Sequence, residues 1–160
     1  MMLPKTDIIQ IETTVVFDQY ADRLAEVMTM FGDRWEKSLG ESLENLRESL
    51  PHVWLGTDVL SGDLVCAASL SDEAPGQQAF LHGLHDPRCK NHPAIGATAM
   101  AVMNYAFETL GVLKLMAECC PRHWGARGFC RRFGFKQVSL RDDRVVYELV
   151  KENYHLLTGE

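Results

Sequence analysis

Two histidines on one short segment are the residues best suited to exchange protons near neutral pH. His82 and His85 lie three residues apart in the segment QQAFLHGLH, and an unperturbed imidazole has a pKa of about 6.5. If this segment is a strand, the two rings point to opposite faces, so at most one of them serves a given site. The alternative for each is a surface or hydrogen-bonded structural histidine.

Glu118 is the third candidate proton acceptor, near the end of the segment LKLMAECC. A carboxylate that acts as a base at neutral pH needs its pKa raised by burial. The alternative is an ion pair with Lys114 or Arg122. The sequence therefore gives three possible bases, two of them imidazoles, on two neighbouring apolar segments.

Other catalytic patterns are weaker or missing. Ser69 or Ser71 could be drawn with His82 as a hydrolase pair, but the chain has no GxSxG elbow. Neither a Walker loop nor a GxGxxG turn occurs. Hydrolase, P-loop and dinucleotide-binding chemistry therefore have little support in the sequence.

The cysteines favour reduced thiols over a disulfide framework. Their number is odd in a chain of 160 residues, which is long enough to build a core without covalent links. Cys119, Cys120 and His123 lie close in sequence, but no CxxC or HxxxH pair accompanies them. We therefore expect no metal site.

The distribution of charge bears on partners and location. The net charge of -6 argues against generic nucleic-acid binding, but nine acidic and four basic residues lie between Glu12 and Glu48, whereas Arg122 to Arg144 holds seven basic and two acidic residues. No apolar run approaches the ~20 residues that cross a bilayer, and the start lacks a signal-peptide core. We expect a single cytoplasmic domain spanning residues 1–160, with no nucleic-acid or membrane partner and a possible homo-oligomer or assembly partner.

The first half of the chain predicts helices and then a β-meander. DIIQI is a candidate first strand, and apolar residues at helical spacing predict one helix from Asp18 to a stop at Gly32 and another from about Asp33 to Leu50. Three segments, HVWLGTDV, DLVCAASL and QQAFLHGLH, then read as antiparallel strands joined by turns at Gly62 and Gly76.

The second half predicts a parallel crossover. A long helix runs from Pro93 to about Leu110, and the strand Leu113 to Cys120 should lie parallel to the preceding strand because a helix joins them. Pro121 opens a further helix, which Gly134 ends. FKQVSL and RVVYELV form a hairpin, and ENYHLL is a tail or short helix. The fold class is α+β, with a mixed, mostly antiparallel sheet, one central parallel crossover and flanking helices.

This order of elements, and the segment AMAVMNYAFETLGVLKLMAECCPRHWGARGFCRRFGFKQV, resemble the GNAT N-acetyltransferase superfamily. Within it, YAFETLGVLKL and the helix ending in FGF look like the branch that acetylates protein N-termini and small amines. The resemblance implies a GNAT-like acyl-CoA N-acyltransferase fold and acetyl-CoA as co-substrate. It also implies that a base from one of two strands, occupied here by His82, His85 or Glu118, accepts the proton of an amine.

The cofactor loop that the resemblance implies is degenerate. The family has Arg or Gln, two residues, Gly, one residue, then Gly or Ala; the matching positions are Pro93, Gly96 and Thr98, and only the glycine agrees. Gly96, Ala97 and Thr98 could still offer backbone N–H groups to a pyrophosphate, with Arg88 and Lys90 adding charge upstream. The alternative is a helix start whose glycine serves packing.

Three residues of the next helix occupy further family positions. His123 stands where an Asn is common, Ala126 keeps a small residue, and Cys130 stands where a Tyr is thought to protonate the departing CoA thiolate. A thiol could donate that proton, but free cysteine also behaves as a small hydrophobe in a core. The expected function is an acetyl-CoA-dependent N-acetyltransferase acting on an amine of a small molecule, peptide or protein. The alternative is a catalytically inactive GNAT-like domain that acts as a binding or structural module in a larger assembly, such as a virus particle.

Overall fold

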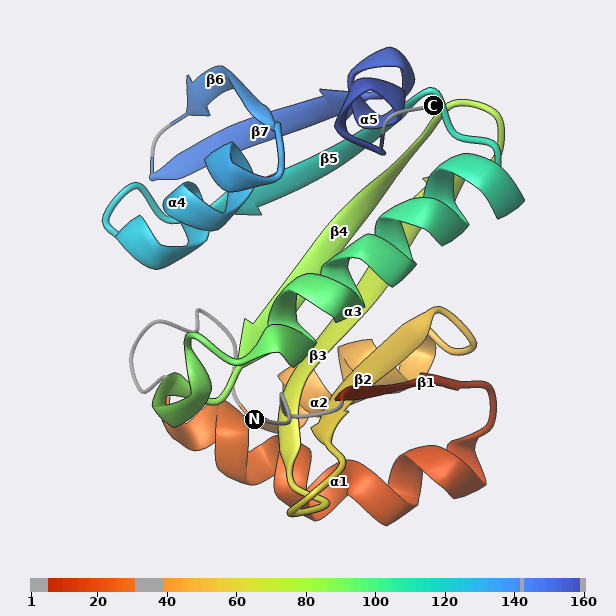
Figure 1. Ribbon diagram of the computed structural model, residues 1–160, viewed down its shortest axis with the longest axis vertical. Coiled ribbons are helices and arrows are strands. Elements are labelled where there is room, and N and C mark those ends of the chain that lie inside the picture. Colours follow the sequence, from red (N-terminus) through yellow and green to blue (C-terminus); the bar gives the residue numbers. More distant parts are fainter. Residues whose placement is uncertain (1–5, 31–38, 142, 159–160) are drawn as a thin grey trace. The chain divides into compact units, whose positions relative to one another are not determined.

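The computed structural model describes residues 6–30, 39–141 and 143–158 (Figure 1). The chain forms two compact units. Unit 1 comprises Met1–Leu70 and Gly83–Val102, and unit 2 comprises Ser71–His82 and Met103–Glu160. Three elements contribute residues to both units: strands β3 (Leu64–Ala74) and β4 (Gln78–His85) and helix α3 (Pro93–Asn104).

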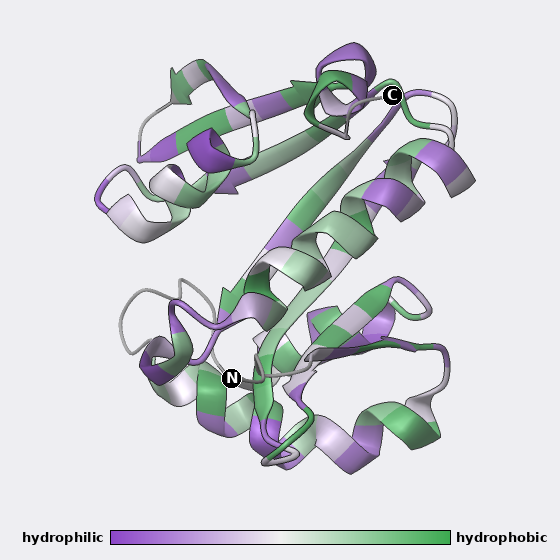
Figure 2. Ribbon diagram, viewed as in Figure 1, coloured by the Kyte–Doolittle hydropathy of each residue, from purple (hydrophilic) through white to green (hydrophobic). Residues whose placement is uncertain are grey.

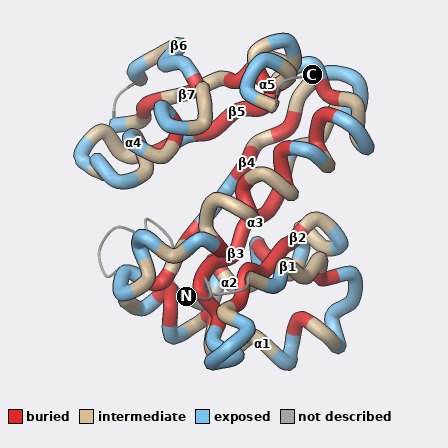
Figure 3. The backbone as a smooth tube through the Cα atoms, viewed as in Figure 1, coloured by how far each residue is buried: buried red, intermediate tan, exposed pale blue. Residues whose placement is uncertain are grey.

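Unit 1 packs two helices on one face of its strands. β1 (Thr6–Ile11) and β2 (Val53–Asp58) pair antiparallel, and β2 pairs antiparallel with β3. α1 (Thr14–Met30) alternates apolar and polar residues along its length (Figure 2), and its apolar stripe joins α2 (Leu39–Glu48) over the strands. Their shared core includes Ile11, Phe17, Leu24, Val27, Leu46, Val53, Leu55 and Leu84. It lies in the buried stretches of these elements in Figure 3.

The start of α3 packs closely on β2 and β3 because of a glycine. A Cβ built on Gly56 of β2 would overlap Thr98 Oγ1, lie 2.7 Å from Cys66 Sγ and lie 3.3 Å from the Ala94 carbonyl oxygen. Only a residue without a side chain lets the helix approach this closely. Cys66 Sγ in turn lies 3.4 Å from Thr98 Oγ1.

Unit 2 is built on the β5–β7–β6 part of the sheet. β5 (Lys114–Cys119) pairs antiparallel with β7 (Arg144–Val150), and β7 pairs antiparallel with β6 (Lys136–Arg141). α3 continues as a π-helical turn, η3 (Tyr105–Thr109), whose Phe107 stacks on Tyr154 of α5 (Lys151–Thr158). α4 (Trp124–Arg132) follows β5. The fully buried side chains of this unit include Met103, Phe107, Leu115, Tyr147 and Leu149.

The sheet has seven strands in the order β1-β2-β3-β4-β5-β7-β6, and β4 and β5 are parallel. The α+β class, the mixed sheet and the central parallel crossover are therefore confirmed. So are the first strand, the three meander strands, the long helix from Pro93 and the closing hairpin. The tail ENYHLL is helical, as α5. Among the described residues, no helix is long and apolar enough to cross a membrane.

Three predicted boundaries are wrong. α1 begins at Thr14 rather than Asp18, because Thr13 caps it by accepting a hydrogen bond from Val16 N–H at 3.3 Å. α4 begins at Trp124 rather than Pro121, because the chain first makes a turn in which His123 N–H donates to the Cys120 carbonyl at 2.9 Å. β3 continues to Ala74, four residues past the predicted Leu70.

Other predicted ends fit or lie outside the described residues. Gly134 follows α4 with φ of +85°, the left-handed conformation that ends many helices. The predicted stop at Gly32 and the start of the second helix at Asp33 fall in residues 31–38, outside the described part. All five cysteines are free.

Candidate active site

The parallel ladder between β4 and β5 is short. Gln78, Ala79 and Phe80 pair with Lys114, Leu115 and Met116, whereas β4 runs on to His85 and β5 to Cys119. The candidate bases His82, His85 and Glu118 all lie beyond the last paired residues of their strands. Backbone N–H and C=O groups that leave a ladder need other partners, which makes this stretch the place where backbone donors can meet a ligand.

His82 is hydrogen-bonded to Ser71 of β3 in unit 2. Ser71 Oγ lies 2.5 Å from His82 Nε2, and the imidazole is exposed. Of the two serines that the sequence offered as partners of His82, Ser69 and Ser71, it is Ser71 that contacts the histidine. A hydroxyl can both donate and accept, so this pair can pass a proton between solvent and the ring.

His85 and Glu118 have different surroundings. His85 is half-buried at the last position of β4, where strand alternation places it on the face opposite to His82. Glu118 is exposed on β5 and therefore lacks the burial that a carboxylate base requires. Lys114, one suggested partner of Glu118, lies 3.8 Å from Glu148 instead. His82 is the strongest of the three candidates.

Asp86 organises the segment that follows β4 in unit 1. Its carboxylate is 1% exposed and accepts hydrogen bonds from Arg88 Nη2 at 2.8 Å, Arg88 Nε at 3.1 Å and Arg23 Nη2 at 2.9 Å. It also caps the 3₁₀ turn η2 (Pro87–Cys89) by accepting from Arg88 N–H at 2.9 Å. The Arg88 side chain, and then the Arg23 side chain, hold the pKa of Asp86 well below its usual range. Arg88 is thus committed first to Asp86, although its side chain is 66% exposed.

The N-terminus of α3 is capped by a histidine. Ala94 N–H donates to His92 Nδ1 at 3.0 Å, and His92 Nε2 lies 2.8 Å from Asp58 Oδ2. Because Nδ1 accepts, the ring proton is on Nε2 and is donated to Asp58. The hydrogen bond from His92, and then that from Ser61 N–H, hold the pKa of Asp58 below its usual range. Ile95 N–H donates to the His92 carbonyl at 3.1 Å.

The predicted cofactor residues at this helix start fit a pyrophosphate only in part. Gly96 and Ala97 are small, half-buried residues, and Lys90 is exposed just upstream. Thr98 is buried, with its hydroxyl against Cys66, so its side chain serves packing. The helix dipole and the small residues suit an anion, but the Ala94 amide already has an acceptor in His92.

The predicted residues on α4 lie in unit 2. His123 is the N-cap residue and Ala126 is half-buried. Cys130 is buried, and burial raises the pKa of its thiol to about 12. Transfer of a proton from this thiol to an ordinary thiolate is uphill by about three pKa units, so Cys130 suits a core position and not the role of proton donor.

Two groups that shape unit 1 were not predicted from the sequence. Asp86 before Pro87 has the pattern of a capping residue followed by proline at the first helical position, which would have marked it as a cap. The contact between Asp58 and His92 joins residues 34 positions apart, and no local spacing signals it.

Comparison with known proteins places this geometry in a recognised fold. No protein-family model matches the sequence, and no curated protein is significantly similar to it. Solved structures do match at low identity. An acetyltransferase of the GNAT family from Bacillus anthracis is 13% identical over 94% of this chain and 99% of its own, with a TM-score of 0.71.

Two further structures extend this finding. The ribosomal-protein-S5-alanine acetyltransferase from Vibrio fischeri is 11% identical over 96% of this chain and 97% of its own, with a TM-score of 0.72. RimJ from Mycobacterium smegmatis, in complex with CoA-disulfide, is 11% identical over 96% of this chain and 88% of its own, with a TM-score of 0.69. Together with the short parallel β4–β5 ladder, these likenesses establish that the chain has the fold of the GNAT N-acetyltransferases.

Proposed function

We propose that the protein is a cytoplasmic N-acetyltransferase that uses acetyl-CoA to acetylate an amine of a small molecule, peptide or protein. The observation that carries the proposal is the β4–β5 ladder, which ends at Phe80 and Met116, with the Ser71–His82 pair just beyond it in unit 2. The fold and its acetyltransferase neighbours support the same reaction class.

In unit 1, the start of α3 would hold the phosphates of acetyl-CoA. Gly96 and Ala97 permit close approach to the helix backbone, and the positive end of the helix dipole favours an anion. Lys90 would add a positive charge. Arg88 would bind a phosphate with the guanidinium N–H groups that do not bond to Asp86. A guanidinium has five N–H donors. Asp86 accepts from two of its nitrogen atoms, Nε and Nη2, and its third contact with Arg88 is to the backbone N–H.

In unit 2, His82 would accept the proton of the amine. The co-substrate supplies an activated acyl thioester, and the amine must lose a proton in order to form the amide. An imidazole titrates near neutral pH, and Ser71 fixes one of its nitrogen atoms. Ser71 would act as a positioning residue, because its hydroxyl orients the ring and can relay the proton to solvent.

The acceptor would be cationic before it loses its proton. The segment from Glu12 to Glu48, which contains all of α1 and α2, holds nine acidic and four basic residues. Opposite charge raises the local concentration of an ammonium group near such a surface.

A second candidate function is a GNAT-fold module without catalysis. It is favoured by the helix start, where His92 already accepts the Ala94 N–H, and by the Asp86–Arg88 pairing. The buried Cys130 in the position of the family's tyrosine points the same way. Such a module would bind a partner through its surface and would not depend on acetyl-CoA.

Thermal unfolding with and without acetyl-CoA separates the two candidates. At a ligand concentration about 100 times Kd, binding adds about 2.7 kcal/mol to the free energy of unfolding, which raises Tm by about 5 to 10 °C in a chain of this length. Desulfo-CoA should give a similar shift, since it keeps the phosphates. If millimolar acetyl-CoA leaves Tm unchanged, the enzyme proposal fails.

Replacing His82 by Ala should lower kcat by about 100-fold or more, because proton transfer by a placed base contributes that much. Ser71→Ala should lower kcat less, because the His82 imidazole is still present. It should also shift the acidic limb of the pH profile of kcat, because the imidazole loses its hydrogen bond to the Ser71 hydroxyl. Release of free CoA thiol against a panel of amines measures both. An equal, pH-independent loss in both variants, or full activity of His82→Ala, would remove His82 from the mechanism.

A further inference from the structure

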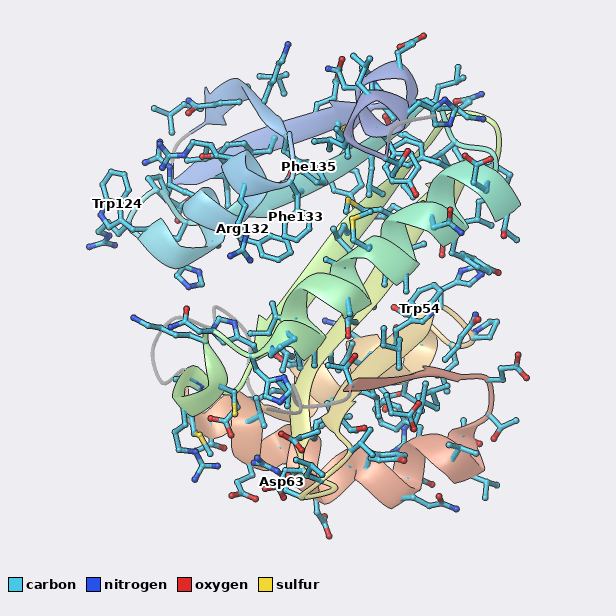
Figure 4. The ribbon with its side chains drawn as sticks, viewed as in Figure 1. Trp54, Asp63, Trp124, Arg132, Phe133 and Phe135 are labelled. Carbon is cyan, nitrogen blue, oxygen red and sulfur yellow. The ribbon has the colours of Figure 1, made fainter. Side chains whose placement is uncertain are left out.

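The outer face of α4 carries an exposed tryptophan held in a fixed position. Trp124 is 66% exposed, and the guanidinium carbon of Arg127 lies 4.7 Å from the centre of its ring. Figure 4 shows Trp124 at the far end of α4, with its ring directed away from the strands of unit 2. One face of the ring therefore contacts a cation, and much of the rest faces solvent.

Arg127 is itself anchored, so the tryptophan platform is rigid. Its guanidinium donates hydrogen bonds to Tyr147 Oη at 3.0 Å, to the Pro121 carbonyl at 3.0 Å and to Gln137 Oε1 at 3.4 Å. Tyr147 is buried in the core. An exposed aromatic ring that is already ordered loses little conformational entropy when it stacks on a ligand.

The segment that carries this ring has only positive charges. The residues from Arg122 to Lys136 include five arginines and lysines and no Asp or Glu. Arg132 lies 5.2 Å from the ring centre of Phe133 and 5.8 Å from that of Phe129. Among the described residues, the four cations of this segment other than Arg127 are exposed and form no ion pair; they are Arg122, Arg131, Arg132 and Lys136.

Two glycines leave the backbone of the same helix face open. Gly125 and Gly128 are exposed within α4, between Trp124 and Arg131. A Cβ built on Gly128 has no atom within 4 Å, and one on Gly125 meets only His123 at 3.8 Å. Glycine weakens a helix interior, and no described residue comes close enough to Gly128 to require it there. The open backbone suits a ligand that lies close along the helix.

We propose that this face of α4, formed by Trp124, Gly125, Gly128, Arg131 and Arg132, binds single-stranded nucleic acid. A base would stack on the free face of the Trp124 ring, and phosphates would pair with Arg131 and Arg132, seven and eight residues further along the helix. A rise of 1.5 Å per residue puts these arginines about 10 Å along the helix from the tryptophan. One single-stranded nucleic acid can therefore contact Trp124 and both arginines at once. Aromatic platforms among cations are how sequence-tolerant proteins hold single strands.

The chain's net charge of -6 does not oppose this surface. The acidic excess lies between Glu12 and Glu48, whereas Arg122 to Lys136 has a local charge of +5. Screening at physiological salt limits exposed charges to a range of about 8 Å, so the nearby residues decide what binds. The proposal is independent of acetyl transfer, and it stands or falls separately from it.

The test is fluorescence anisotropy with a labelled single-stranded RNA of about 12 nucleotides, the length that one small binding surface covers. We expect a micromolar Kd at low salt. With two phosphate contacts, at Arg131 and Arg132, affinity should fall about sevenfold between about 50 and 200 mM salt. Trp124→Ala should weaken binding about tenfold or more through lost stacking, while Trp124→Phe should keep most of it.

Charge-matched variants sharpen the test. Arg131→Gln should weaken binding and reduce the slope of log affinity against log salt by about 0.7, the value for one phosphate contact on a single strand. Lys151→Gln, which removes one charge from α5 in the same unit, should change neither. The proposal is overturned if no binding occurs at about 100 μM protein in low salt, if Trp124→Ala binds normally, or if the two charge variants behave alike. Displacement of the RNA by poly-glutamate or acetyl-CoA with equal potency would also overturn it, because the surface would then serve another anion.

Discussion

Asp86→Asn is expected to lower the free energy of unfolding by about 3 kcal/mol, the size of effect seen when one partner of a buried ion pair is removed. Asp86 is 1% exposed and accepts from both Arg23 and Arg88. An amide of the same shape loses the charge that pairs both guanidinium groups. The Arg23 side chain, only 24% exposed, is then left with the more exposed Glu26, 3.5 Å away, as its carboxylate partner.

The effect of this substitution should depend on pH. Arg88 and Arg23 hold the pKa of Asp86 well below its usual range, so the folded state keeps the carboxylate charged where the unfolded chain protonates near pH 3.9. The resulting stability is fully present above that pH and is lost as pH falls toward the folded-state pKa. The difference between wild type and Asp86→Asn should therefore be constant from pH 8 to about pH 5 and shrink at lower pH.

Urea unfolding at several pH values measures this difference. Asp18→Asn is the matched control, since Asp18 also pairs with an arginine, at 2.9 Å from Arg47, but both side chains are well exposed. Its cost should stay below about 1 kcal/mol. Equal costs for the two variants, or an Asp86 effect that grows in acid, would contradict the role of the buried carboxylate.

Gly56→Ala should destabilise the chain by about 3 kcal/mol, at the upper end of the range for overpacked cores. The new methyl group would overlap Thr98 Oγ1 and lie 2.7 Å from Cys66 Sγ. Both atoms belong to buried side chains that have little room to move, so we expect α3 to shift away from β2. A fall in Tm of about 6 to 12 °C is the measurement to make.

Two controls accompany this variant. Gly128→Ala changes the same residue type where a Cβ meets nothing within 4 Å, and it should leave stability unchanged or raise it by up to about 1 kcal/mol. Adding Thr98→Ala to Gly56→Ala should recover part of the loss, because it removes the hydroxyl that the methyl group overlaps. If Gly56→Ala unfolds with the wild-type Tm, the close approach of α3 to β2 is refuted.

The fold could be predicted from the sequence because its signals are local. Apolar periodicity, together with Pro93, Gly111 and Gly134, located the helices. A helix-length connection between two apolar segments predicted the parallel pair β4–β5. The errors occurred where a single hydrogen bond sets a boundary, as at Thr13, which starts α1 four residues early.

The candidate site was only partly predictable, since its decisive contacts join distant residues. The sequence named His82 and Ser71, but it could not show that their side chains meet across β3 and β4. It suggested that Arg88 could add charge beside a cofactor, but it gave no sign that Arg88 also pairs with Asp86. It left Cys130 open as an acid or a core residue, and burial with a pKa of about 12 favours the core.

His92, at the start of α3, determines which ligands can compete for the Ala94 N–H group. Ala94 N–H and Asp58 already hold the His92 ring from both sides, so this loop is folded before any ligand arrives and little ordering entropy opposes entry. An incoming group would exchange one acceptor for another, and its advantage over a neutral imidazole would be its charge at the positive end of the helix. A pyrophosphate has that advantage. An acyl-pantetheine stripped of its nucleotide does not, and the exchange would therefore discriminate between whole and truncated co-substrates.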